Sequence, residues 1–93
     1  MGRRAEVVQA SAARLRQQWP SCEAFGVQGD VRSPEKCAAT VAAVVERFGR
    51  LDVLVNAAAG NFMALAQELG PKGFKTVVDI DLLGTFNLSL IHI

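Results

Sequence analysis

The sequence predicts an α/β fold, in which a parallel sheet carries helices on both faces. Three observations indicate this class. Helical and strand-like segments alternate along the chain, a helix-capping pattern stands at residues 33–35, and a β-branched run at residues 51–55 leads directly into small residues. Strands that alternate with helices of this length need crossover connections, and these connections make neighbouring strands parallel.

The first helix is expected over residues 5–19, because Val8, Ala12 and Leu15 share one face and Pro20 ends the element. A short strand is expected next, over residues 22–31, leaving the sheet at a Gly-Asp pair.

The second helix is expected to begin at Ser33-Pro34-Glu35, where serine caps, proline fits the first turn and the acid faces the positive end of the dipole. Apolar residues then recur at helical spacing until Gly49 ends the element. Residues 51–55 are expected to form a buried parallel strand, and a last helix is expected to open at Gly70-Pro71 and to run past Leu82.

The composition is that of a globular chain, since 51% of its 93 residues are hydrophobic and 20% are charged. Ten Lys and Arg against nine Asp and Glu give a net charge of +1, so no strong field attracts nucleic acid or a membrane surface. Two cysteines show no metal-ligand spacing, so no metal site is expected and a reducing compartment is indicated. No apolar run has the roughly 18 residues of a membrane span, and tyrosine is absent.

Two polar places have both an ordinary and a functional interpretation. Arg3 and Arg4 stand before the first helix as a solvated charge pair or as phosphate ligands, since an Arg near the end of the second strand accepts the 2′-phosphate of NADP in nucleotide-binding α/β folds. Asp30 ends the first visible strand, where it can face an adenine amino group or simply form an Asx-type loop.

Two further places lie in the second half of the chain. The small residues Ala57–Gly60, flanked by Asn56 and Asn61, leave the backbone nearly bare for a flat ligand or for tight helix-to-sheet packing. Asp81 projects onto the apolar stripe of the last helix, where a carboxylate is costly unless it is paired, hydrogen-bonded or protonated. Asp79 is expected to point elsewhere, into solvent; the ordinary role for Asp81 is to hold a neighbouring backbone group.

Taken together, these residues resemble a known family. GRLDVLVNAA at residues 49–58 resembles the fourth-strand signature of short-chain dehydrogenases/reductases, and Gly29-Asp30-Val31 is similar to that family's third-strand exit. NAAAGNF at residues 56–62, with FKTVVDID and GTFN further on, resembles the 2,4-dienoyl-CoA reductases, above all the peroxisomal branch. The resemblance covers residues 2 to about 89.

The resemblance implies a partial Rossmann-type doubly wound parallel sheet, with strands 3 and 4 and their flanking helices, in which residues 1–93 are an internal fragment of a single NADP-binding domain. It also implies an NADPH-dependent oxidoreductase that reduces 2,4-dienoyl-CoA to 3-enoyl-CoA in the β-oxidation of unsaturated fatty acids. The parent is expected to be peroxisomal and homo-oligomeric through the last helix. The chain itself carries no targeting signal, so a cytoplasmic location stays open.

The family's site residues transfer to matching positions of this chain. Asp81 would be catalytic, orienting or supplying a proton. The cofactor would be bound by Arg3, Arg4, Asp30, Val31, Asn56, Ala57, Ala58 and Gly60. The acyl-CoA substrate would contact Arg32, Phe62, Gly70, Pro71 and Lys72.

Several family features are absent from these residues: the Gly-rich phosphate loop, the first strand, the Tyr-x-x-x-Lys pair and the lysine that the peroxisomal branch uses. Residues 90–93 also stop matching the family helix. The chain is therefore expected to be inactive alone. Two alternatives stay open: a fragment of another short-chain reductase of the 3-oxoacyl type, and a non-catalytic module that docks on the full-length enzyme.

Overall fold

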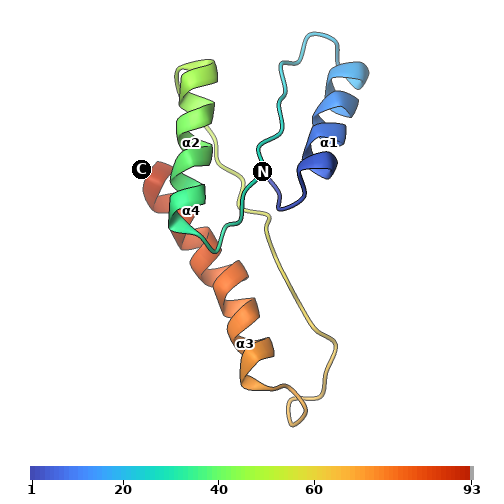
Figure 1. Ribbon diagram of the computed structural model, residues 1–93, viewed down its shortest axis with the longest axis vertical. Helices are drawn as coiled ribbons and strands as arrows, with labels where there is room; N and C mark the ends of the chain where they lie inside the picture. Colours follow the sequence, from blue (N-terminus) through green and yellow to red (C-terminus); the bar gives the residue numbers. More distant parts are fainter. Residues whose placement is uncertain (93) are drawn as a thin grey trace. The chain divides into compact units, whose positions relative to one another are not determined.

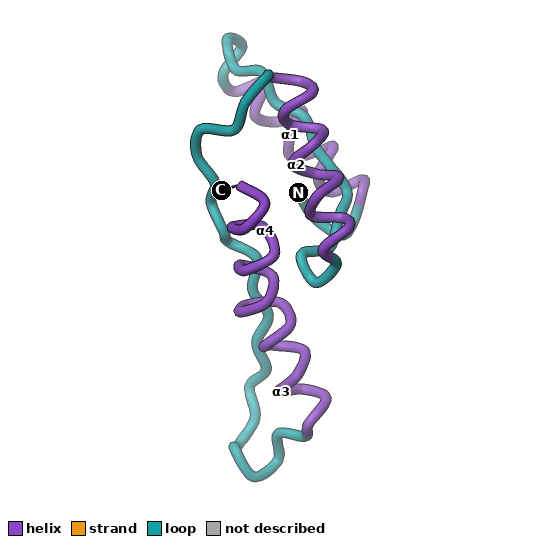
Figure 2. Tube along the Cα trace, turned by 90° about the vertical axis from the view of Figure 1, so that its left-hand side faces the viewer, coloured by secondary structure: helices purple, strands orange, loops and turns teal. Residues whose placement is uncertain are grey.

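The computed structural model describes residues 1–92, with side chains through residue 91. The chain divides into two compact units, Met1–Asp30 and a second that begins at Val31. The described elements are helical, as Figure 2 shows, and loops connect them. None of the described helices is both long and apolar enough to cross a bilayer.

The first unit consists of α1 (Ala5–Gln18) and the segment that returns along it. The helix matches the predicted span, and Trp19 N–H closes it by donating to Leu15 O at 2.9 Å. The returning segment passes very close to α1, because a β-carbon on Gly26 would lie 2.6 Å from the carbonyl oxygen of Val8. Glycine is therefore needed at residue 26 for this approach.

The second unit begins with α2 (Pro34–Phe48), which confirms the predicted capping pattern. Ser33 Oγ accepts a hydrogen bond from the backbone N–H of Lys36 at 3.3 Å, and Ser33 Oγ–H donates to Glu35 Oε2 at 3.1 Å. Gly49 ends the helix in the left-handed conformation, with φ 85°. Glycine adopts this conformation without steric cost, as the C-terminal position of a helix often requires.

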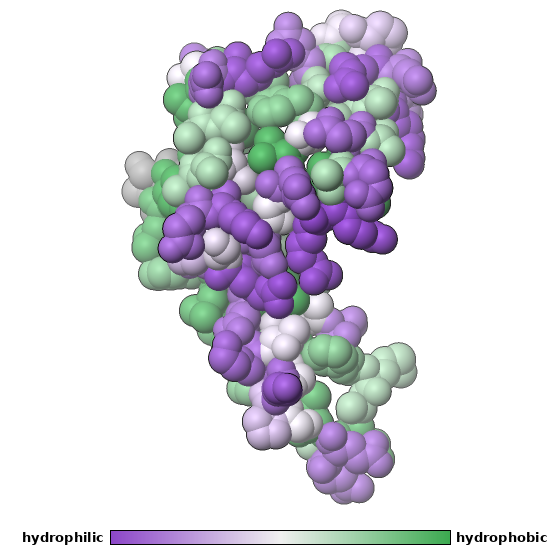
Figure 3. Space-filling model, in the orientation of Figure 1, coloured by the Kyte–Doolittle hydropathy of each residue, from purple (hydrophilic) through white to green (hydrophobic). Residues whose placement is uncertain are grey.

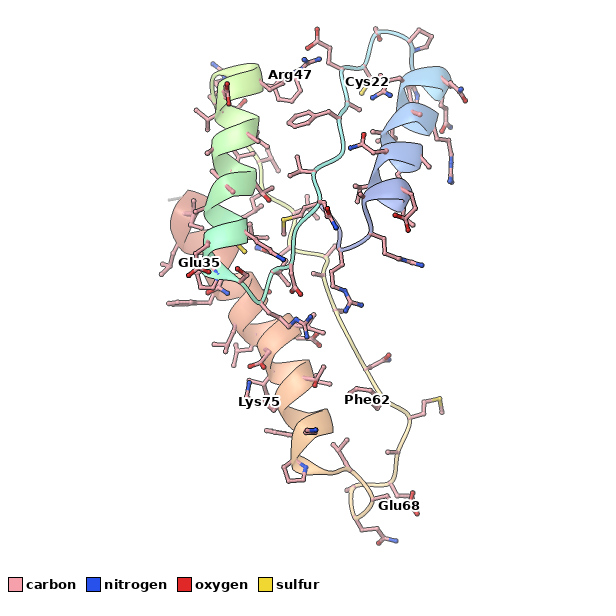
Figure 4. The ribbon with its side chains drawn as sticks, in the orientation of Figure 1. Cys22, Glu35, Arg47, Phe62, Glu68 and Lys75 are labelled. Carbon is pink, nitrogen blue, oxygen red and sulfur yellow. The ribbon has the colours of Figure 1, made fainter. Side chains whose placement is uncertain are left out.

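The cap of α2 gives a first testable prediction. Hydrogen bonds from its own backbone N–H and from Ser33 hold the pKa of Glu35, which Figure 4 labels at the start of α2, below its usual value. Ser33→Ala removes the cap, and we expect the free energy of unfolding to fall by about 1 kcal/mol at neutral pH. Urea unfolding followed by helical circular dichroism measures the change.

The pH dependence follows from the direction of the Glu35 shift. A folded-state pKa below the unfolded one contributes stability that is complete above the unfolded pKa and is lost as the pH falls through the folded pKa. The difference between wild type and Ser33→Ala should therefore shrink at acidic pH. A difference that stayed constant down to full protonation of the glutamates would contradict the role given to Glu35.

A continuous helical run occupies the end of the second unit (Figure 1). It comprises α3 (Pro71–Val77), the π-helix η1 (Val78–Leu83) and α4 (Gly84–His92). In η1 the Gly84 N–H donates to Asp79 O, an i to i+5 hydrogen bond that gives a wider turn than in an α-helix. The predicted start at Gly70-Pro71 and the continuation past Leu82 are confirmed.

The core of the second unit lies where α2 packs against α4. Cys37 on α2 is fully buried and Leu88 on α4 is 9% exposed. Two side chains converge on the carbonyl oxygen of Val31: Cys37 Sγ lies at 3.5 Å and Asn87 Nδ2 at 2.9 Å. Residue 31 is thus held by both helices of this core.

The two predicted strands, 22–31 and 51–55, are not formed among the described residues, which contain one isolated parallel bridge, between Gly2 and Gln28. A strand needs neighbours to bond its backbone N–H and C=O groups. Val53 and Val55 are 74% and 77% exposed, so no neighbouring strand or helix covers this segment. The predicted strand at residues 51–55 is therefore not formed, and its predicted burial is wrong.

Candidate functional site

The segment of small residues, 56–60, runs beside the last helical run and is attached to it at both ends (Figure 2). At one end, Asn56 Nδ2 donates to Ser89 Oγ at 3.1 Å. At the other, the Gly60 N–H donates to Asp81 Oδ1 at 2.8 Å. The segment therefore lies antiparallel to the helix, and the three alanines between the attachments carry no large side chain.

Asp81 is exposed and hydrogen-bonded, not buried among apolar side chains as the helical projection predicted. Its expected need for a hydrogen bond is confirmed by Gly60, whereas its expected burial is wrong. Asp79, expected to be solvated, is the less exposed of the two, with 23% of its side chain accessible and an ion pair to Lys75. Faces assigned with 3.6 residues per turn do not apply inside η1, so the helical projection did not predict which of the two aspartates is more exposed.

The two arginines of the first unit stand where a short parallel contact ends. Gly2 N–H donates to Val27 O at 3.2 Å, and Gly29 N–H donates to Gly2 O at 2.8 Å. Parallel pairing brings the following residues of both segments to the same edge. Arg3 and Arg4 are both exposed. They follow the parallel contact on one segment, and Asp30 follows it on the other, so they lie at the same edge of the contact.

In the second unit, Val31 is packed tightly and Arg32 is exposed. A β-carbon on Gly84 would lie 2.6 Å from Val31 Cγ2, so glycine is needed where α4 passes residue 31. Together with the hydrogen bond from Asn87, this contact holds the backbone that leads into Arg32.

Four of the five predicted substrate residues, all except Arg32, lie around the start of α3. Phe62, 56% exposed, lies on the loop before this helix, as Figure 4 shows, and its ring would be 3.8 Å from a β-carbon on Gly73. Gly70 and Pro71 form the first turn, in which Phe74 N–H donates to Gly70 O at 3.2 Å, and Lys72 is exposed there. An aromatic ring and a cation are therefore presented at one end of the second unit.

Two residues of α4, Asn87 and Ser89, hold Val31 and Asn56, but neither was predicted as a site residue. Both are polar side chains on a helix that is otherwise mostly apolar, between Phe86, Leu88 and Leu90. That contrast was the available signal. Within residues 1–92, no group of three His, Cys, Asp or Glu side chains is placed to hold a metal ion.

Comparison with known proteins supplies a family for this geometry. The family model described as short chain dehydrogenase matches residues 1–92. The peroxisomal 2,4-dienoyl-CoA reductase [(3E)-enoyl-CoA-producing] of Arabidopsis thaliana is 50% identical over 88 residues, which are 95% of this chain and 29% of that protein. A probable 2,4-dienoyl-CoA reductase [(2E)-enoyl-CoA-producing] of Bacillus subtilis is 49% identical over 62 residues, 67% of this chain and 24% of that protein.

The fold is also found among solved structures. An actinorhodin polyketide ketoreductase determined with NADPH superposes with a TM-score of 0.90 at 36% identity, covering 98% of this chain and 34% of the other. The chain spans less than a third of the length of the two reductases compared above.

Proposed function

Because the chain belongs to the short-chain dehydrogenase family, we propose that it is part of an NADPH-dependent 2,4-dienoyl-CoA reductase and carries residues that face the cofactor and the substrate. The observation that carries the proposal is the hydrogen bond from Gly60 N–H to Asp81 Oδ1, at 2.8 Å. It brings an exposed carboxylate to the end of the small-residue segment. The proposed reduction needs a group that handles a proton, and it needs room for the flat nicotinamide ring beside that group. The likeness to two dienoyl-CoA reductases supports the substrate class.

The reaction requires one hydride and one proton. Reducing a 2,4-dienoyl thioester to a 3-enoyl thioester adds one hydrogen at C5 and one at C2. The product then has a single carbon–carbon double bond, which joins C3 and C4. NADPH, when bound, supplies the hydride. Asp81 would orient or deliver the proton at C2, through a water molecule, since its carboxylate is exposed and already oriented by Gly60.

The cofactor residues are proposed for three parts of the cofactor. Arg3 and Arg4 present guanidinium groups suited to the 2′-phosphate, and Asp30 and Val31 would hold the adenine. Residues 56–60 would face the ribose and the nicotinamide. The bare backbone of Ala57 and Ala58 between the two hydrogen-bonded ends supports this role, because no large side chain prevents a flat ring from approaching.

The acyl-CoA would be recognised at the start of α3. The exposed ring of Phe62 offers an apolar surface for the acyl chain, and Lys72 in the turn opened by Gly70 and Pro71 offers a cation for the CoA phosphates. Arg32, also exposed, would contribute a second cation.

A second copy of the parent protein is the proposed partner of the last helical run. Phe74, Leu82, Phe86 and Leu90 are large apolar side chains of this run, and they are 63%, 65%, 56% and 56% exposed. Figure 3 shows apolar surface at the left edge of the view, where Figure 1 draws α4. Exposed apolar side chains along one helical run indicate an interface. We propose a peroxisomal location for the parent, in line with the name of the Arabidopsis relative.

The test of this function uses the Arabidopsis reductase as a host. Its 88 matching residues are replaced by those of this chain, and the chimera is assayed with 2,4-dienoyl-CoA by the loss of NADPH absorbance. We expect turnover within about tenfold of the host, and a much lower rate with NADH, because the arginine pair favours the 2′-phosphate. The isolated 93-residue chain should show no turnover, since its segment 51–55 has no sheet to enter.

The assay also separates the alternatives. A chimera that reduces a 3-oxoacyl-CoA but leaves the dienoyl-CoA unchanged would replace the proposed substrate with that of another short-chain reductase. A folded chimera inactive on both substrates would overturn the proposal, and inhibition of the intact host by the added chain would favour a docking module.

A further inference from the structure

The small-residue segment is held by two hydrogen bonds whose spacing on the helix matches their spacing on the segment. Asp81 and Ser89 are eight residues apart, about 12 Å along a helix at 1.5 Å per residue. Their partners, Gly60 and Asn56, are four residues apart, about 13 Å in an extended chain. The two spans agree, so both hydrogen bonds form while the segment stays extended.

We infer that Ser89 is a positioning residue for the cofactor: its hydroxyl holds the Asn56 side chain and thereby keeps residues 56–60 extended along the helix. The inference rests on the proposed function, because it assigns this segment to the nicotinamide side of NADPH. Ser89 itself does not touch the cofactor. It acts through Asn56, whose Nδ2 lies 3.1 Å from Ser89 Oγ.

The surroundings of Ser89 suit this task. It is half-buried and follows Leu88, which is 9% exposed and anchors α4 in the core against α2. Asn87, two residues earlier, holds Val31 at 2.9 Å. The hydroxyl of Ser89 is therefore presented from a fixed turn of helix, whereas Asn56 lies on a segment without regular structure, and the ordered partner positions the other.

Loss of the Ser89 hydroxyl frees one end of the segment only. Gly60 remains attached to Asp81, so the proton-handling carboxylate keeps its orientation. The freed end must be ordered again each time the cofactor binds, and this cost raises the concentration of cofactor required. We expect the KM for NADPH to change while kcat stays the same.

The first experiment compares Ser89→Ala, Ser89→Thr and Thr76→Ala in the chimera that carries this chain. Ser89→Ala should raise the KM for NADPH roughly 3- to 10-fold, the range of one neutral hydrogen bond, with kcat within about twofold. Ser89→Thr keeps the hydroxyl and should restore the KM. Thr76→Ala is the matched control, because Thr76 Oγ1–H donates to Lys72 O within its own helix at 2.8 Å.

The second experiment needs no turnover and uses the 93-residue chain with labelled asparagine side chains. Asn56 and Asn61 are both exposed, so the Asn56 amide proton bonded to Ser89 should exchange more slowly than those of Asn61 in the wild type and in Ser89→Thr, and equally fast in Ser89→Ala. The Asn87 amide, bonded to Val31, should be unaffected. This readout tests the contact itself, so an inactive chimera would overturn the proposed function without deciding the role of Ser89.

Three results would overturn the inference: an unchanged KM in Ser89→Ala, a KM that Thr does not restore, or equal losses of thermal stability and kcat with no specific change in KM. The last result would mean that Ser89 only stabilises the fold. If the isolated chain shows no dispersed spectrum, the kinetic comparison in the chimera decides alone.

Discussion

Asp81→Ala is expected to lower kcat of the dienoyl-CoA reductase chimera by roughly 100-fold or more, the usual contribution of a positioned acid or base. The variant removes the carboxylate and also the acceptor for Gly60 N–H, which lies 2.8 Å from Oδ1. Proton delivery at C2 is then impaired, so kcat should fall. The small-residue segment also loses its attachment at Gly60, so the KM for NADPH should rise. Steady-state kinetics with both substrates varied measures the two effects.

Asp81→Asn separates these effects, because the amide oxygen can still accept from Gly60 whereas the side chain no longer ionises. We expect its KM for NADPH to stay near the wild-type value while kcat falls almost as far as in Asp81→Ala. Asp79→Asn is the matched control on the same π turn, since its carboxylate pairs with Lys75. Wild-type kcat in Asp81→Asn would refute a proton-handling role and leave Asp81 as a positioning residue.

Gly84→Ala is expected to cost about 1 kcal/mol of unfolding free energy, although alanine is the better helix former. The gain in helix propensity is about 1 kcal/mol. Against it, the added β-carbon would lie 2.6 Å from Val31 Cγ2 and 3.0 Å from Val31 Cβ, and overpacking of this kind costs about 1–3 kcal/mol. The contact is so short, and the branched Val31 side chain so stiff, that the steric term should exceed the propensity gain.

Chemical denaturation of wild type, Gly84→Ala, Val31→Ala and the double variant measures this contact. The double variant should recover part of the loss, because Val31→Ala removes the methyl group that the new β-carbon meets first. Strict additivity of the two single changes, or a stabilised Gly84→Ala, would show that α4 can move away from residue 31 at little cost.

The helices of this chain were predictable because their signals are local. Ser33, Pro34 and Glu35 mark the start of α2, and Gly49 marks its end in the left-handed conformation. Pro71 likewise opens α3 directly after Gly70. Each signal acts between residues a few positions apart, so no distant part of the protein can remove it.

The candidate site was predictable in its residues but not in its contacts. Asn56 and Gly60 were predicted to belong to a segment of small residues that a flat ligand can approach, and Asp81 was predicted to need a hydrogen bond. Their partners were not apparent, because Asn56 reaches Ser89 and Gly60 reaches Asp81 only when the segment lies antiparallel to the helix. A pattern of spacing along one element carries no information about such a juxtaposition.

The sequence alone determined the helix ends, the family signature at residues 49–58 and the residue types of the site. Tertiary structure decided the contact of Asp81, because its hydrogen bond from Gly60 N–H joins residues 21 positions apart, whereas Asp79 pairs with Lys75 only four residues away. It also decided the state of residues 51–55, whose β-branched pattern predicts a strand but whose backbone groups need neighbouring strands to pair with. Helices satisfy their hydrogen bonds within one segment and strands do not, and this difference separates what the chain specifies locally from what only packing can settle.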